Sequence, residues 1–161
     1  MRKHIVWASA TLALVIAACG SSSATSSATP TPTCVNAGAP HRAYVVVEHR
    51  SGTSLQRCVG FTGDTLDAQA LMDGSGIEYQ AQTFSFGKAV CQIDNEPATF
   101  SQCLPANQPY WSLFIETGGA WATAQTGYTD VKLHDKEAIG WHYVLYDPNL
   151  RPSPPPLATE G

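Results

Sequence analysis

Residues 43–61 read AYVVVEHRSGTSLQRCVGF, and this stretch decides the fold class that we expect for the chain. Ala43 to His49 is apolar and β-branched, which is typical of a strand buried on both faces. Arg50-Ser51-Gly52-Thr53 carries turn chemistry, and Leu55 to Phe61 returns as a second strand. Two strands joined so briefly predict an antiparallel hairpin.

The next segment, Thr65 to Met72, predicts a helix. It has no β-branched residue after Thr65. Asp64 or Thr65 can cap its start, and Gly74 suits a left-handed stop. We expect about three turns, with the residues of one buried face being Leu66, Ala70 and Leu71.

Apolar runs separated by turn residues predict further strands after the helix. They are expected at 77–81, 88–93, 110–115, 121–123, 131–133 and 140–146. One helix on one face of a mixed sheet is an α+β arrangement. The order of elements fits a disulfide-stabilised β-grasp, in which the sheet curls around the helix.

The chain begins with the features of an export signal. Arg2, Lys3 and His4 precede an apolar stretch, Ile5 to Ala18, which is shorter than a bilayer span. This pattern predicts a secretory signal peptide at residues 1–18. The end of the stretch, Val15 to Gly20, resembles the lipobox of bacterial lipoproteins, which implies cleavage before Cys19 and a diacylglyceryl group on its thiol. The alternatives are an ordinary signal peptide with a chance cysteine and an uncleaved anchor.

Composition then divides the rest of the chain. Residues 19–33 hold the lipidated cysteine and a Ser/Thr/Ala/Pro-rich segment with almost nothing to bury, so we expect a flexible tether. Residues 34–147 are long enough for one domain with a real core. Residues 148–161 are Pro-rich and predict a disordered tail. We therefore expect a protein anchored by lipid to the extracytoplasmic face of the cell membrane.

Charge and cysteine usage agree with that compartment. Loss of Arg2 and Lys3 with the signal leaves seven basic and 13 acidic residues, a net charge of −6, which argues against nucleic-acid partners. The four cysteines other than Cys19 form an even set, which predicts two disulfides in an exported chain. We favour Cys34–Cys58 and Cys91–Cys103 over a zinc site, because no CxxC pair is present.

A family resemblance covers residues 43–146. It rests on the hairpin, the 65–71 helix and three further segments. These are residues 89–94, then Tyr110-Trp111-Ser112 with Trp121, and last Gly127, Val131 and Gly140-Trp141-His142-Tyr143. These resemble the domains of unknown function that are similar to the C-terminal domain of transcobalamin and intrinsic factor. The chain departs from that pattern at Asn95 and at 135–137. The resemblance implies a β-grasp fold and, in the vertebrate carriers, a contribution to cobalamin binding, which we do not extend to this chain.

The candidate ligand-binding residues are aromatic. Tryptophans and tyrosines with polar edges can stack against flat ligands such as sugars, and the same side chains can instead form the core of a small sheet. Both interpretations stay open for the set Tyr110, Trp111, Trp121, Trp141 and Tyr143.

Other chemistries have weaker signals. The group His134, Asp135, Glu137 and His142 contains metal-binding side chains, but its spacing matches no established metal motif, so we expect no metal and no cofactor. No GxSxG motif, catalytic triad pattern or phosphate loop is present in the sequence, so we expect no enzymatic activity. The sequence favours a non-enzymatic envelope lipoprotein that binds a small ligand or carbohydrate. The alternative is a structural or adhesive domain that binds another envelope protein.

Overall fold

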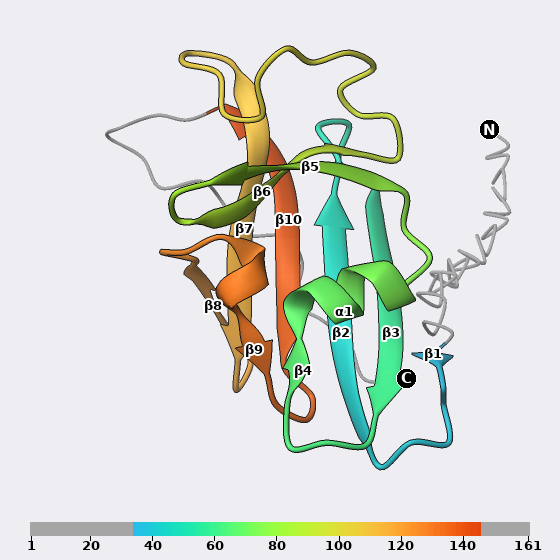
Figure 1. The fold of residues 1–161 in the computed structure, drawn as a ribbon. Helices are drawn as coiled ribbons and strands as arrows, with labels where there is room; N and C mark the ends of the chain where they lie inside the picture. The colour runs from blue at the N-terminus through green and yellow to red at the C-terminus, as the bar shows by residue number, and fades with distance from the viewer. Residues whose placement is uncertain (1–33, 146–161) are drawn as a thin grey trace, which may run out of the picture.

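The main element of the fold is a six-stranded mixed sheet (Figure 1). The structure, a computed structural model, describes residues 34–145. The strand order is β1 (Cys34–Val35), β3 (Ser54–Phe61), β2 (His41–Glu48), β10 (Ala138–Leu145), β7 (Pro109–Thr117) and β8 (Ala120–Thr123). The predicted hairpin is present as the antiparallel pair β2–β3, in which Tyr44 lies opposite Cys58.

The last strand of the domain lies at the centre of the sheet. Strand β10 runs parallel to β2, with Ile139 beside Val45, and antiparallel to β7, with Ile139 opposite Ile115. This insertion joins the early hairpin to the late strands. The first four residues of β10, Ala138 to Trp141, are buried, and the second half of the strand is partly or fully exposed.

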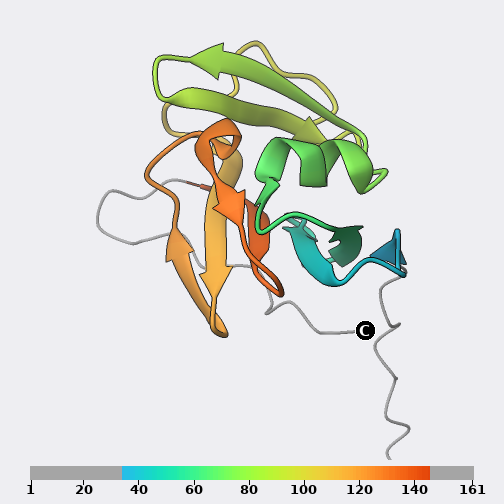
Figure 2. The same cartoon turned by 60° about the horizontal axis from the view of Figure 1, so that its bottom comes forward.

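One face of this sheet is covered by a second layer. Helix α1 (Ala68–Gly74) and the hairpin of β5 (Tyr79–Phe84) and β6 (Gly87–Ile93) lie over it, β5–β6 running across the strands (Figures 1 and 2). The short pair β4 (Leu66–Asp67) and β9 (Lys132–Leu133) and the 3-10 turn η1 (Tyr128–Asp130) complete the layer. The core between the layers includes Val45, Leu71 and Trp141, each at most 1% exposed.

The expected α+β, β-grasp-like class is wrong. Strands account for 51% of the described residues and helices for 9%, so the domain is mostly β. The reason lies in what covers the sheet: the β5–β6 hairpin occupies much of the face that a longer helix would fill. The disulfides that were part of the same expectation are present.

The helix is also shorter than the sequence pattern predicts. It has seven residues, because Leu66 and Asp67 pair with Leu133 and Lys132 as strand β4 instead of entering the helix. The buried face consists of Ala68, Leu71 and Met72, whereas Ala70 is exposed and Leu66 is only partly buried. The helix includes Gly74, and the positive φ that ends the turn belongs to Gly76, at 74°.

Both predicted disulfides are confirmed. Cys34–Cys58 links the terminal strand β1 to β3, where the two residues are register partners in a parallel pair. Cys91–Cys103 links β6 to the long segment that precedes β7. Each therefore fixes a piece of chain that few other contacts would hold.

Several predictions concern residues outside the described range. The signal peptide, the lipidated Cys19, the tether and the tail from 148 all lie beyond residues 34–145 and stay predictions. Within the described range, no helix is both long and apolar enough to span a bilayer.

Candidate functional site

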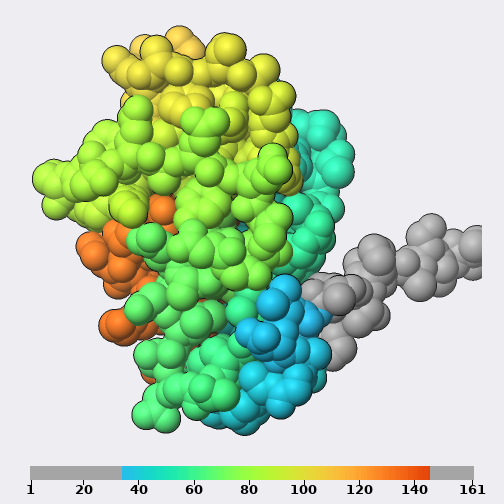
Figure 3. All heavy atoms as spheres, turned by 45° about the vertical axis from the view of Figure 1, so that its right-hand side comes forward, coloured from blue at the N-terminus to red at the C-terminus, as the bar shows by residue number. Residues whose placement is uncertain are grey.

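A cavity of about 700 Å³ opens at one end of the sheet. It lies under the segment 97–109, shown in yellow at the top of the molecule in Figure 3, and against the ends of β6, β7 and β10. The side chains that line it are aromatic, small or amide-bearing: Cys91, Pro97, Thr99, Phe100, Ser101, Gln102, Cys103, Pro105, Ala106, Gln108, Pro109, Tyr110 and Tyr143.

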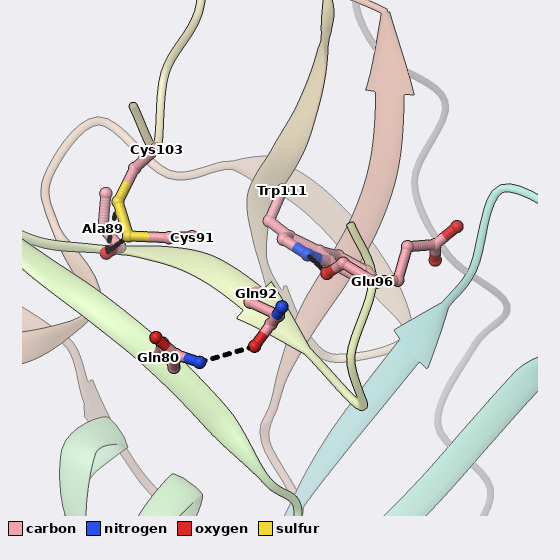
Figure 4. Close-up of a disulfide and its surroundings, with 7 residues drawn as sticks. All are labelled: Gln80, Ala89, Cys91, Gln92, Glu96, Cys103 and Trp111. Atoms are coloured by element: carbon pink, nitrogen blue, oxygen red, sulfur yellow. Dashed lines mark hydrogen bonds between the residues drawn. A yellow bond between two sulfur atoms is a disulfide. The ribbon is translucent and has the colours of Figure 1, made fainter. Parts of the chain in front are cut away.

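The disulfide Cys91–Cys103 forms part of the cavity wall. It fixes the middle of the 97–109 segment to strand β6, a buried strand of the covering hairpin (Figure 4). Both cysteines are 3% exposed, so the bridge is shielded from solvent. The wall is therefore held covalently at a point where the chain has no strand or helix of its own.

Hydrogen bonds fix the start of the same segment. The Gln92 Nε2 donates to the Pro97 carbonyl at 2.7 Å. The Gln80 Nε2 donates to Gln92 Oε1 at 2.6 Å (Figure 4). The indole Nε1 of Trp111 donates to the Glu96 carbonyl at 2.8 Å. These bonds hold the chain around Pro97, which lines the edge of the cavity.

A tight turn precedes these residues. Ile93 and Glu96 exchange backbone hydrogen bonds of 3.0 and 2.8 Å, and the residues between them, Asp94 and Asn95, have φ values of 45° and 63°. Asp and Asn tolerate positive φ better than most residues, so the turn is available without glycine.

A cluster of polar groups lies at the turn that precedes the cavity wall. Nδ1 of His49 lies 2.7 Å from Glu96 Oε2, and its Nε2 lies 3.7 Å from Asp94 Oδ2. The imidazole also meets the edge of Trp111 at a centroid distance of 5.5 Å. The two carboxylates approach opposite ring nitrogens and hold the imidazole between them. The three side chains are therefore not directed at a common point where a metal ion could bind. The cluster ties strand β2 to the turn that begins the cavity wall.

Tyr143 links this cluster to the cavity. Its ring lies 5.1 Å from that of Trp111, and its side chain lines the cavity. Burial raises the pKa of the Tyr143 hydroxyl, and the nearby Glu96 raises the pKa further while Arg50 acts against it. The hydroxyl therefore stays protonated at neutral pH and is able to donate or accept a hydrogen bond.

The sheet separates the five aromatic candidates. Trp111, Trp141 and Tyr143 point to the core side, where Trp111 and Trp141 are 2% and 1% exposed. The indole of Trp141 donates to Met72 Sδ at 3.3 Å, so it is part of the core. Tyr110 and Trp121 lie on the opposite face of β7 and β8, since neighbouring strand residues alternate. Of the five, Tyr110 and Tyr143 line the cavity.

The four metal-type residues do not converge. His134 Nδ1 lies 3.3 Å from Glu137 Oε2, Asp135 accepts from the backbone N–H of Arg42, and His142 lies 3.7 Å from Glu48. Between Cys34 and Leu145, no three His, Cys, Asp or Glu side chains are arranged to hold a metal ion.

Sequence reasoning missed the segment that contributes most to the cavity. Thr99, Phe100, Ser101, Gln102 and Gln108 follow no strand or helix pattern, so periodicity gave no reason to select them. The usable signal was the pair Cys91 and Cys103, because binding residues are often found on loops that a rigid scaffold holds in place, and a disulfide fixes this loop to strand β6.

Comparison with known proteins gives a fold relationship only. No protein-family model and no curated protein matches the sequence. A crystal structure of a "putative metal binding protein" from Ruminococcus gnavus is similar, with a TM-score of 0.50 and 14% sequence identity over 66% of this chain and 99% of that one. At this identity the likeness concerns the fold and carries no ligand across.

Proposed function

We propose that this protein is a non-enzymatic binding module of the cell envelope that captures a neutral carbohydrate in the cavity under residues 97–109. Its export signal and the lipobox resemblance at Cys19 support display on the outer face of the membrane. The single observation that carries the ligand proposal is the cavity lining: aromatic rings and uncharged polar side chains surround about 700 Å³.

The absence of charge from this lining selects the ligand class. No Asp, Glu, Lys, Arg or His is among the described residues that line the cavity. A charged ligand would lose its hydration shell there without a countercharge, which is costly. A sugar offers hydroxyl groups to the Thr99, Ser101 and Gln102 side chains and an apolar ring face to Tyr110 or Phe100.

The cavity size suits a short oligosaccharide. Ligand sites commonly enclose about 300–1,000 Å³, and the observed volume is within that range. The rigid wall also favours binding, since a wall held by Cys91–Cys103 has less freedom to lose when the ligand is bound.

A thermal-shift and calorimetric screen of the full chain tests the proposal. The probes are neutral oligomers of glucose and of N-acetylglucosamine, an anionic uronic acid oligomer, and divalent metal ions alone. A ligand at 100 times its Kd stabilises by about 2.7 kcal/mol, which raises Tm by several degrees. We expect a shift with a neutral sugar and none with the anionic oligomer or the metals.

Two variants and one control locate the site. Tyr110→Ala removes a lining ring and Tyr143→Phe removes one hydroxyl, so both are expected to weaken sugar binding. Phe86→Ala is the matched control, since Phe86 is a 42% exposed aromatic at the β5–β6 turn, outside the lining. Sugar binding that all three variants retain equally would exclude this cavity, and a shift with metals alone would favour a metal-binding function instead.

A further inference from the structure

His49 lies between the main sheet and the turn that begins the cavity wall. It follows β2 directly, and its backbone is bonded within the β2–β3 turn, to the Thr53 carbonyl at 2.9 Å and the Gly52 N–H at 2.8 Å. The ring of Trp111 lies nearly perpendicular to the imidazole. The His49 side chain is 16% exposed, so its ring nitrogens face mostly protein groups.

These nitrogens face two different carboxylates. Nδ1 lies 2.7 Å from Glu96 Oε2, and Nε2 lies 3.7 Å from Asp94 Oδ2. A neutral imidazole has one N–H, so it meets one carboxylate with a donor and the other with a lone pair. An imidazolium has two N–H groups and a positive charge, so it attracts both carboxylates. The arrangement is therefore matched to the protonated form of His49.

Both carboxylates belong to the turn from which the 97–109 segment starts. The Glu96 carbonyl accepts from Trp111 Nε1 at 2.8 Å and from the Ile93 N–H at 3.0 Å. The next residue, Pro97, lines the cavity. Asp94 lies two residues before Glu96 in the same turn, with a φ of 45°. The attraction between His49 and these two side chains therefore acts on the start of the cavity wall.

We propose that His49 is the positioning residue of the cavity wall, and that protonation of its imidazole makes the 97–109 segment more rigid. Histidine is the side chain whose charge ordinarily changes between pH 5 and 8. As the pH rises through this range, the contact with Asp94 loses its attraction and the turn opens more often. The consequence for binding rests on the proposed function: a neutral sugar has no charge to titrate, so its Kd should rise with the opening of the wall.

Other ionisable groups lie at the same end of the sheet. The backbone N–H of Arg50 lies 3.4 Å from Glu96 Oε2, and arginine does not titrate in this pH range. Burial raises the pKa of the Tyr143 hydroxyl, which therefore stays protonated. His142 Nε2 lies 3.7 Å from Glu48 Oε2 on β2. The test therefore leaves this second histidine in place.

Hydrogen–deuterium exchange of the full chain, read by mass spectrometry on peptides from 94–109, measures the opening of this segment without any ligand. In the wild type we expect these peptides to exchange at least about threefold faster at about pH 8 than at about pH 5.5, after correction for the intrinsic rates. His49→Gln should remove this difference. The matched control is His134→Gln, which should keep it: His134 also lies 3.3 Å from a carboxylate, that of Glu137, but it precedes the opposite end of β10.

Three outcomes overturn the proposal. They are equal exchange of the wild type at both pH values, a pH difference that His49→Gln retains, and loss of the difference in His134→Gln. A purely structural His49 gives the second of these, because its replacement speeds exchange at both pH values alike.

A second variant decides the question if His49→Gln does not fold. Asp94→Asn removes one carboxylate charge and keeps a residue type that accepts positive φ, so the pH difference should shrink, and an unchanged difference would refute the proposal. The absence of any sugar ligand would refute the proposed function and leave the exchange result as it stands. A sugar Kd that does not change with pH, beside exchange that does, would refute the consequence for binding.

Discussion

Removal of the Cys91–Cys103 disulfide is expected to separate stability from binding. The double substitution Cys91→Ser and Cys103→Ser opens a loop whose ends are 12 residues apart in sequence. For a loop of this length, the chain-entropy relation gives a loss of about 3 kcal/mol in the free energy of unfolding. The same change frees the 97–109 wall, so ligand binding then has to order it.

The matched control is the other disulfide. Cys34→Ser with Cys58→Ser opens a loop between residues 24 apart and should cost about 3.5 kcal/mol by the same relation. It affects the β1–β3 edge of the sheet, and neither cysteine lines the cavity. The two double variants therefore have similar predicted stabilities and different predicted effects on the site.

The assay combines urea unfolding with calorimetric titration of the sugar found in the screen. We expect both variants to lose stability, whereas only the Cys91/Cys103 variant binds more weakly, by at least about tenfold in Kd, or ~1.4 kcal/mol. The reasoning is refuted if the Cys91/Cys103 variant binds as the wild type does, or if the Cys34/Cys58 variant loses binding to the same extent.

Two further predictions concern the packing of the domain. Gly127→Ala should lower the free energy of unfolding in urea by about 1–3 kcal/mol, because a Cβ there would lie 2.6–2.7 Å from backbone atoms of Gly87 and Lys88. Gly38→Ala is the control: a Cβ at that position would have no atom within 4 Å, so stability should change by less than about 0.5 kcal/mol. Equal losses in the two variants would contradict the close approach at Gly127. Burial raises the pKa of Glu116, so the folded state binds the carboxyl proton more tightly than the unfolded state does. This group therefore favours folding most at a pH below its ordinary pKa, and the contribution is lost as the pH rises through the raised pKa of the folded state. Glu116→Gln, whose amide oxygen can keep the bond from the Gly119 N–H, should raise Tm at pH 7 more than at pH 4, and a Tm difference that is the same at both pH values would refute this sign.

The sequence alone determined the local elements and the covalent links. The hairpin at 43–61 follows from a β-branched run and a turn, which act over short distances, and both disulfides followed from cysteine number and position. Asn95 is of a residue type that tolerates positive φ, and its φ is 63°. These features depend on neighbours in the chain, so a single sequence contains the information.

Only the tertiary structure decided which face of each strand is core. Alternation requires Tyr110 and Trp111 to lie on opposite faces, but it does not say which face α1 and the β5–β6 hairpin cover. The helix pattern failed at Leu66 for the same kind of reason: pairing with Leu133, far along the chain, satisfied its backbone as a strand. Long-range pairing overrides local propensity because a backbone group makes its hydrogen bonds where the whole fold places a partner. The His49–Glu96 contact and the cavity under residues 97–109 likewise join residues that are distant in sequence, so no local pattern records them.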